Sequence, residues 1–164
     1  SASVAIYRRS AVNLATNGRL FDPYYFSYQE DVDLAWQLQL RGYDSVILLD
    51  KAAYHQRSTQ DAVRGVLSTA INKQMQSPMV RFCSYRNHLA TIIKNDQWQN
   101  FTLDFPWILW YEVMKFVYIL FFDRETLKGL RELWNERVWL KSERNRIQTG
   151  AKVHWKKIGQ WMYM

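Results

Sequence analysis

The sequence is poor in cysteine, proline and glycine. Cys83 is the only cysteine among 164 residues, so an intrachain disulfide and a zinc site built on cysteines are both excluded. A single free cysteine is typical of a protein from a reducing compartment. The sequence contains no G-x-G-x-x-G and no Walker A pattern, so it lacks the two common glycine-rich phosphate-binding loops.

Positive charge and aromatic side chains are present in excess. The formal net charge is +7, and residues 124–164 hold ten Lys and Arg against four Asp and Glu. Aromatic residues make up 16% of the chain, with eight tryptophans, and such side chains are enriched at interfaces and membrane surfaces. The basic segment predicts an anionic partner such as lipid head groups or a diphosphate. No nucleic-acid-binding motif occurs, so we expect no nucleic-acid partner.

The residue pattern changes near residue 60. Short apolar runs with β-branched members at 2–7 and 45–49 predict strands, and residues 30–41 have helical spacing with Gly42 placed as a C-terminal cap. Further helices are expected over 61–76, over 79–94, from Pro106 (with Thr102 or Asp104 as cap) to about Phe122, and within 125–145. We therefore predict an α/β segment over residues 1–60, followed by a helical segment over residues 61–164.

Three carboxylates lie close together at Glu30, Asp31 and Asp33. Asp31 and Asp33 look like a metal-binding Asp-x-Asp pair, but residues two apart on a helix lie on nearly opposite faces. We therefore interpret the pair as unsuited to a shared metal ion. At a helix N-terminus a carboxylate is favoured by the dipole and can accept a proton from a reacting group. The simpler alternative is that these acids only cap the first helical turn.

Other candidate residues are less specific when taken alone. An aromatic loop over residues 21–28 precedes the acids and offers flat surfaces to a sugar ring. His55 follows a predicted strand, but one histidine cannot form a metal site, and most lone histidines are structural. His88 and His154 have no acidic neighbours in the sequence, and we assign them no role.

Several short motifs occur together along the chain: Phe21-Asp22-Pro23, Tyr25-Phe26, Tyr28, Glu30-Asp31-Val32-Asp33-Leu34, Arg41-Gly42-Tyr43, Tyr54-His55, Tyr85-Arg86-Asn87-His88-Leu89 and Arg144-Asn145-Arg146-Ile147-Gln148. This combination resembles family 2 glycosyltransferases of the GT-A fold, in the bacterial branch of rhamnosyltransferases and galactofuranosyltransferases. The resemblance covers residues 1 to about 148. It implies that residues 1–60 form part of a Rossmann-like GT-A domain, followed by C-terminal α-helices.

The resemblance also implies a role for each matching residue. Asp31 would be the base that deprotonates the acceptor hydroxyl, and Glu30 would help to hold the acceptor. His55 would be one ligand of a Mg²⁺ or Mn²⁺ ion on the donor diphosphate, while Tyr28 and Arg86 would bind substrate. The reaction would be an inverting transfer of a rhamnose- or galactofuranose-type sugar from a nucleoside-diphosphate sugar to a glycan or polyprenyl-linked acceptor.

The sequence departs from this family in one important respect. Such enzymes begin with a nucleotide-binding half that ends in an Asp-x-Asp metal motif, and that half is not in this sequence. We therefore expect the chain to be an incomplete piece of the enzyme, inactive or nearly so by itself. Two other interpretations stay open: a non-enzymatic basic and aromatic module that binds a membrane or polyanion, and an inactive fragment.

A hydrophobic stretch over residues 101–122 contains only Asp104, Glu112 and Lys115 as charged residues. It is long enough to suggest a transmembrane helix, but two charges lie near its centre, where lipid disfavours them. It could instead be buried in the protein, or it could lie in the membrane interface with aromatic side chains at head-group depth: Trp107, Trp110, Tyr111 and Tyr118. The interfacial alternative predicts a cytoplasmic protein held peripherally on the anionic inner face of the cell membrane.

Overall fold

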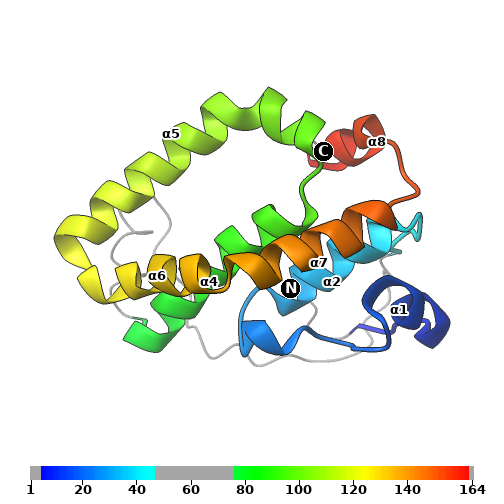
Figure 1. The fold of residues 1–164 in the computed structure, drawn as a ribbon, viewed down its shortest axis with the longest axis horizontal. Coiled ribbons are helices and arrows are strands. Elements are labelled where there is room, and N and C mark those ends of the chain that lie inside the picture. Colours follow the sequence, from blue (N-terminus) through cyan, green and yellow to red (C-terminus); the bar gives the residue numbers. More distant parts are fainter. Residues whose placement is uncertain (1–4, 47–75, 163–164) are drawn as a thin grey trace.

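The computed structural model describes residues 5–46 and 76–162, and within them every regular element is helical (Figure 1). In chain order these are α1 (Arg9–Thr16), the 3₁₀ turn η1 (Pro23–Tyr25), α2 (Glu30–Leu40), α4 (Pro78–Asn95), α5 (Trp98–Phe122), the 3₁₀ turn η2 (Arg124–Leu127), α6 (Lys128–Asn135), α7 (Arg137–Thr149) and α8 (Trp155–Met162). The described residues contain no strand. The predicted α/β fold class, with its partial Rossmann-like GT-A domain, is therefore wrong for this part of the chain.

The two predicted strands account for this error. Only residues 5–7 and 45–46 of those segments are described, and neither is in a strand. A short apolar run becomes a strand only beside another strand that takes up its N–H and C=O groups, and no described segment provides one. The helix predicted over 61–76, apart from Gln76, and the boundary near residue 60 lie outside the described residues.

Local signals set the ends of α2 and α4. After α2, Gly42 takes a φ of 87°, a left-handed conformation that glycine adopts without a steric penalty. Ser77 caps α4 by accepting a hydrogen bond from the backbone N–H of Val80 at 3.4 Å. Pro78 follows in the first turn, where its missing N–H has no helical partner to lose. The helices predicted over 30–41 and 79–94 are confirmed.

The helix α5 begins earlier than predicted. Pro106 was expected in its first turn, but the helix starts at Trp98 and continues through Pro106. A tertiary contact supports the added turns, because the side-chain amide of Asn100 donates to the carbonyl oxygen of Trp155 in α8 at 3.0 Å. The ribbon of α5 is bent (Figure 1), as expected where a proline removes a helical hydrogen bond.

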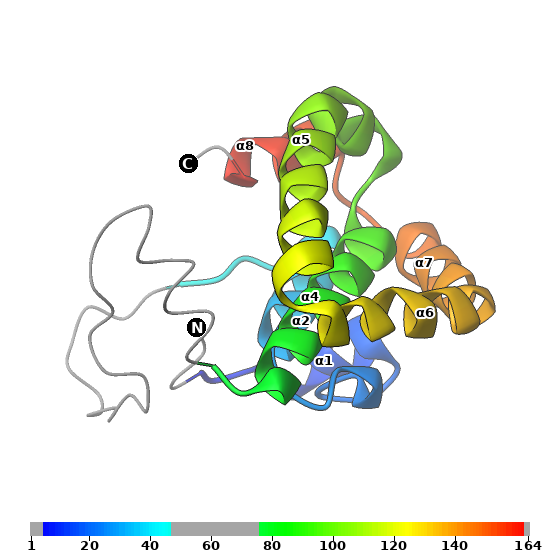
Figure 2. The ribbon, with the colours of Figure 1, turned by 90° about the vertical axis from the view of Figure 1, so that its left-hand side faces the viewer.

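The helices pack around α4, which is in contact with α2, α6 and α7, while α1 packs against α2 (Figures 1 and 2). Two small apolar clusters hold them. One joins α2, α7 and α8 through Leu40, Ile147 and Ile158. The other joins α4, α6 and α7 through Ala90, Leu133 and Leu140. These clusters are small. Buried polar side chains also join α2 to α4, through hydrogen bonds that Lys94 and Asn95 donate to Asp33.

Candidate functional site

Asp33 lies at the centre of a buried polar network. Its side chain is 3% exposed and accepts hydrogen bonds from four donors: the Tyr25 hydroxyl at 3.1 Å, Gln37 Nε2 at 2.8 Å, Asn95 Nδ2 at 2.7 Å and Lys94 Nζ at 3.2 Å. The fully buried Lys94 also pairs with Asp22 at 2.6 Å. A carboxylate whose lone pairs are occupied by protein donors has little capacity left for a ligand. Asp33 therefore has a structural role, in agreement with the interpretation that Asp31 and Asp33 do not share a metal ion.

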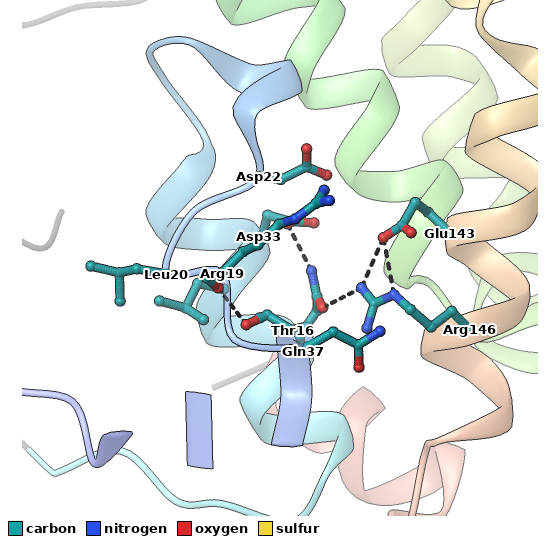
Figure 3. Close-up of a pocket in the computed structure, with 10 residues that line it drawn as sticks. Thr16, Arg19, Leu20, Asp22, Asp33, Gln37, Glu143 and Arg146 are labelled. Carbon is teal, nitrogen blue, oxygen red and sulfur yellow. Dashed lines mark hydrogen bonds and ion pairs between the residues drawn. The ribbon is translucent and has the colours of Figure 1, made fainter. Parts of the chain in front are cut away.

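A small polar cavity of about 150 Å³ borders this network beside α2 (Figure 3). Arg146 of α7 lies in its wall, where it donates to the carbonyl oxygen of Ala15 at 2.8 Å and to Gln37 Oε1 at 3.0 Å. It also pairs with Glu143 at 2.9 Å. Arg146, Gln37 and Glu143 of this wall thus bind one another, and the basic motif that contains Arg146 joins α7 to α1 and α2.

The loop that leads to Asp31 has an unusual backbone. Phe26, Tyr28 and Gln29 have backbone φ values of 57°, 69° and 71°, a region that residues other than glycine rarely adopt. The fully buried Asn87 holds this conformation, since its Nδ2 lies 2.7–2.8 Å from three loop carbonyl oxygens, those of Tyr25, Ser27 and Tyr28. Strained backbone of this kind persists only where the surroundings enforce it, and it is concentrated at functional sites.

Arg86 supports the same loop from α4. Its guanidinium pairs with Glu132 at 2.7 Å, donates to the carbonyl oxygen of Tyr24 at 2.8 Å and lies over the Tyr24 ring at 4.6 Å. Its Nε donates to Asn87 Oδ1 at 3.0 Å. The sequence predicts that Arg86 binds substrate. In this arrangement it positions the loop, and most of its N–H donors are engaged by protein acceptors.

Asp31 itself is partly exposed, in the first turn of α2. One carboxylate oxygen accepts a hydrogen bond from the following backbone N–H at 2.9 Å. Tyr7 lies within its electrostatic reach, because burial and, to a smaller extent, the charge of Asp31 raise the pKa of Tyr7. Glu30 stands next to Asp31 with Oε2 buried and unbonded among the described residues, and Tyr28 is 43% exposed. Tyr28, Glu30 and Asp31 thus lie close together along the loop and the first turn of α2, and Tyr7, which the sequence did not indicate, is near enough for the charge of Asp31 to act on its hydroxyl.

Gln29 of the loop also lines a second cavity, of about 280 Å³, against α4 and α5. The wall is aromatic and polar, with Gln29, Gln76, Arg81, Ser84, Tyr85, His88, Tyr111, Lys115, Tyr118, Ile119, Asp123 and Thr126. Its charges are balanced, since Arg81 pairs with Asp123 at 2.7 Å and Lys115 with Glu112 at 3.2 Å. Aromatic faces with hydroxyl and amide groups but no net charge suit a neutral polyhydroxy ligand better than a phosphate.

The sequence assigned no role to His88, yet it is part of this wall. Its Nε2 lies 3.0 Å from Glu112 Oε1. Burial raises the pKa of Glu112, but the hydrogen bond with His88 and the charge of Lys115 outweigh burial and leave that pKa below its ordinary value. Burial and the charge of Glu112 raise the pKa of Tyr85 to about 12, so its phenol stays neutral at physiological pH.

One pattern in the sequence could have indicated the residues that line this cavity. Tyr85 and His88 are three residues apart on α4, and three residues of α5 follow the same helical period: Tyr111, Lys115 and Tyr118. Residues at such spacings share one face of a helix. The spacing places polar aromatic side chains together on each helix, although it does not reveal that the two faces meet.

His55, the predicted metal ligand, lies outside the described residues. Within the described ranges, no group of three or more His, Cys, Asp or Glu side chains is arranged to hold a metal ion. These residues do not by themselves form the Mg²⁺ or Mn²⁺ site that the resemblance implies, and the cation stays a prediction.

Comparisons with known proteins give no match for this chain. No protein-family model, no curated protein and no solved structure matches it. The interpretation of the site therefore depends on its own residues and geometry.

Proposed function

We propose that this chain supplies the catalytic base and the acceptor-binding surface of an inverting glycosyltransferase that uses a nucleoside-diphosphate sugar. The placement of Asp31 carries the proposal. A partly exposed carboxylate stands at a helix N-terminus, directly after a strained and internally braced loop whose Gln29 opens onto a tyrosine-lined cavity. The sequence resemblance of the Glu-Asp block to family 2 glycosyltransferases supports the same assignment.

In the proposed reaction the acceptor sugar lies against the tyrosine side chains of the cavity of about 280 Å³. Asp31 does not line this cavity, so the acceptor would extend past Gln29, the lining residue from the loop, to place one hydroxyl at Asp31. Asp31 takes the proton of that hydroxyl while its oxygen forms a bond to the anomeric carbon of the donor. The bond from the anomeric carbon to the nucleoside diphosphate breaks on the opposite face, so the configuration inverts. Glu30 accepts a hydrogen bond from a second acceptor hydroxyl. The donor nucleotide is expected to bind residues outside the described part of the chain.

The buried surroundings suit a base that must be held in place. A general base acts at hydrogen-bond distance from the proton that it removes, about 3 Å between heavy atoms. Asn87 fixes the loop before Asp31, and the pair of Asp33 with Lys94 fixes the first turns of α2. The position of Asp31 is thus set by buried groups, while the residue itself is partly exposed.

The test is Asp31→Asn in the protein as its host expresses it. We would measure sugar transfer to a membrane extract from labelled dTDP-rhamnose, UDP-galactofuranose, UDP-glucose and GDP-mannose. Loss of a general base predicts a fall in turnover of roughly 10²–10⁴-fold, with the helical circular dichroism unchanged. Asp44→Asn is the matched control, because Asp44 is an exposed carboxylate just beyond α2 and should leave transfer near normal.

Near-normal turnover of a folded Asp31→Asn protein would contradict the role of Asp31 as base. Absence of transfer by the wild-type protein with every donor would count against the enzyme, and would favour the alternative of a membrane- or polyanion-binding module.

A further inference from the structure

We infer that the outward face of α5 rests on an anionic lipid bilayer, with the helix lying along the bilayer surface. This inference goes beyond the proposed catalytic function and does not depend on it. It is carried by the exposure of α5, the inward direction of its central charges, the attachment of both its ends, and the excess of positive charge near its start.

The apolar side chains of α5 are exposed. Asn100 and Ile119 are the only buried residues of its 25, and the helix is long and apolar enough to cross a membrane by length and composition alone. The exposed side chains include Trp107 at 77%, Trp110 at 67% and Phe121 at 69%. Packing among the described residues does not explain so apolar a helix, and a large exposed apolar patch marks a membrane or partner surface.

The two central charges of α5 do not interrupt this face. Glu112 Oε1 lies 3.0 Å from His88 of α4 and 3.2 Å from Lys115. The Lys115 ammonium also lies 5.7 Å from the ring centroid of Tyr85 in α4, and both charged side chains are only 17% exposed. Because the charges are paired and turned toward α4, their presence in the sequence is not a reason to keep α5 out of contact with lipid.

Both ends of α5 are fixed to the same helical body, so the helix lies in the plane of the bilayer and does not cross it. Near its start, Asn100 donates to the Trp155 carbonyl of α8 at 3.0 Å, and just after its end Asp123 pairs with Arg81 of α4 at 2.7 Å. Figure 1 shows α5 as an arch attached in this way. A helix of 25 residues is about 37 Å long. Crossing the bilayer would draw charged parts of the attached helices into hydrocarbon.

Positive charge is in excess near the start of the arch, where α8 packs and where Lys152 and Lys156 are exposed. After its C-terminal end, Arg124 and Arg131 alternate with the exposed Glu125 and Glu132. Tryptophan at head-group depth and cations beside it are the chemistry that binds an anionic lipid surface. Charge complementarity therefore favours the bilayer as the occupant.

The test is binding to vesicles, with the protein as its host expresses it. Wild-type protein should bind vesicles of phosphatidylcholine with one third phosphatidylglycerol, bind pure phosphatidylcholine more weakly, and be released by salt. The double variant Trp107→Glu/Trp110→Glu should bind the anionic vesicles roughly tenfold more weakly or worse, because carboxylates on this face would enter the lipid interface. Both positions are mostly exposed, so the variant should remain folded, which circular dichroism would verify.

The matched control is Leu14→Glu on α1, which lies across the helical body from the arch of α5 in Figure 1. It also adds a carboxylate at an exposed leucine, and it should bind vesicles as the wild type does. Absence of wild-type binding to the anionic vesicles would overturn the inference, and so would unchanged binding of the double variant. A stable dimer that fails to bind vesicles and that the double variant dissociates would show that a second copy covers this face.

Discussion

Replacing Asp33 by Asn should destabilise the protein far more than the same change at Asp31, although the two carboxylates are neighbours in the sequence. Asp33 Oδ2 accepts hydrogen bonds from both Gln37 and Lys94. In the Asp33→Asn variant the side-chain oxygen can take the place of Oδ1, and the NH₂ group then takes the place of Oδ2. That NH₂ would face two other donors, Gln37 Nε2 and Lys94 Nζ, and could accept a hydrogen bond from neither. Gln37 cannot invert its own amide to compensate without losing the bond that Arg146 donates to its Oε1 at 3.0 Å.

The magnitude follows from what Lys94 loses. Breaking a buried ion pair by removing one partner typically costs about 3–5 kcal/mol. Lys94 keeps Asp22 at 2.6 Å, so we place the loss of unfolding free energy for Asp33→Asn near the lower end, at about 3 kcal/mol. Asp31→Asn changes a partly exposed carboxylate at a helix N-terminus, where a negative charge is typically worth about 0.3–1 kcal/mol.

Urea unfolding, followed by tryptophan fluorescence and by far-ultraviolet circular dichroism, would measure both changes under the same conditions. A domain of this size has a total stability of roughly 5–15 kcal/mol, so the difference between the variants is easily resolved. A cost below about 1 kcal/mol for Asp33→Asn, or equal costs at the two positions, would refute the buried network as the support of α2.

Two other predictions concern buried polar groups. Asn87→Ala removes the donor that holds three loop carbonyls, so it should cost about 2 kcal/mol and speed amide hydrogen exchange over residues 25–29; unchanged exchange would contradict this role. Burial is the main cause that raises the pKa of Asp96 from 3.8 to about 6, against the opposing charge of Arg144. The folded protein therefore holds a proton that the unfolded chain releases, and stability falls as pH rises through this window. Asp96→Asn should raise the unfolding free energy by up to about 3 kcal/mol at pH 8 and hardly at pH 4, whereas a gain independent of pH would refute the argument.

The local sequence was sufficient to predict those helices whose ends are set by neighbouring residues. Gly42 ends α2 and the Ser77-Pro78 pair begins α4 through contacts within a few residues, and both helices were predictable from those signals. The periodicity of residues 30–41 also showed that Asp31 and Asp33 point in different directions. It did not show which of them is buried, because two of the four donors that bind Asp33 come from Lys94 and Asn95, which are 61 and 62 residues away along the chain.

The strand predictions failed for a related reason. A β-branched apolar run has the same local pattern whether or not a neighbouring strand exists, and only a neighbour makes it a strand. The start of α5 shows a similar dependence on distant residues. Pro106 favours a first turn by its own geometry, but the contact between Asn100 and α8 supports the helix that precedes it.

The catalytic and membrane proposals both involve α5, but they depend on different faces of it. Tyr111, Lys115 and Tyr118 line the cavity assigned to the acceptor, whereas Trp107 and Trp110 belong to the exposed apolar face. A helix that separates a sugar-sized cavity from a lipid surface would let an acceptor keep its polyprenyl chain in the bilayer while its sugar reaches the cavity. A lipid-linked acceptor thus fits both proposals at once, and each proposal is tested by its own side chains.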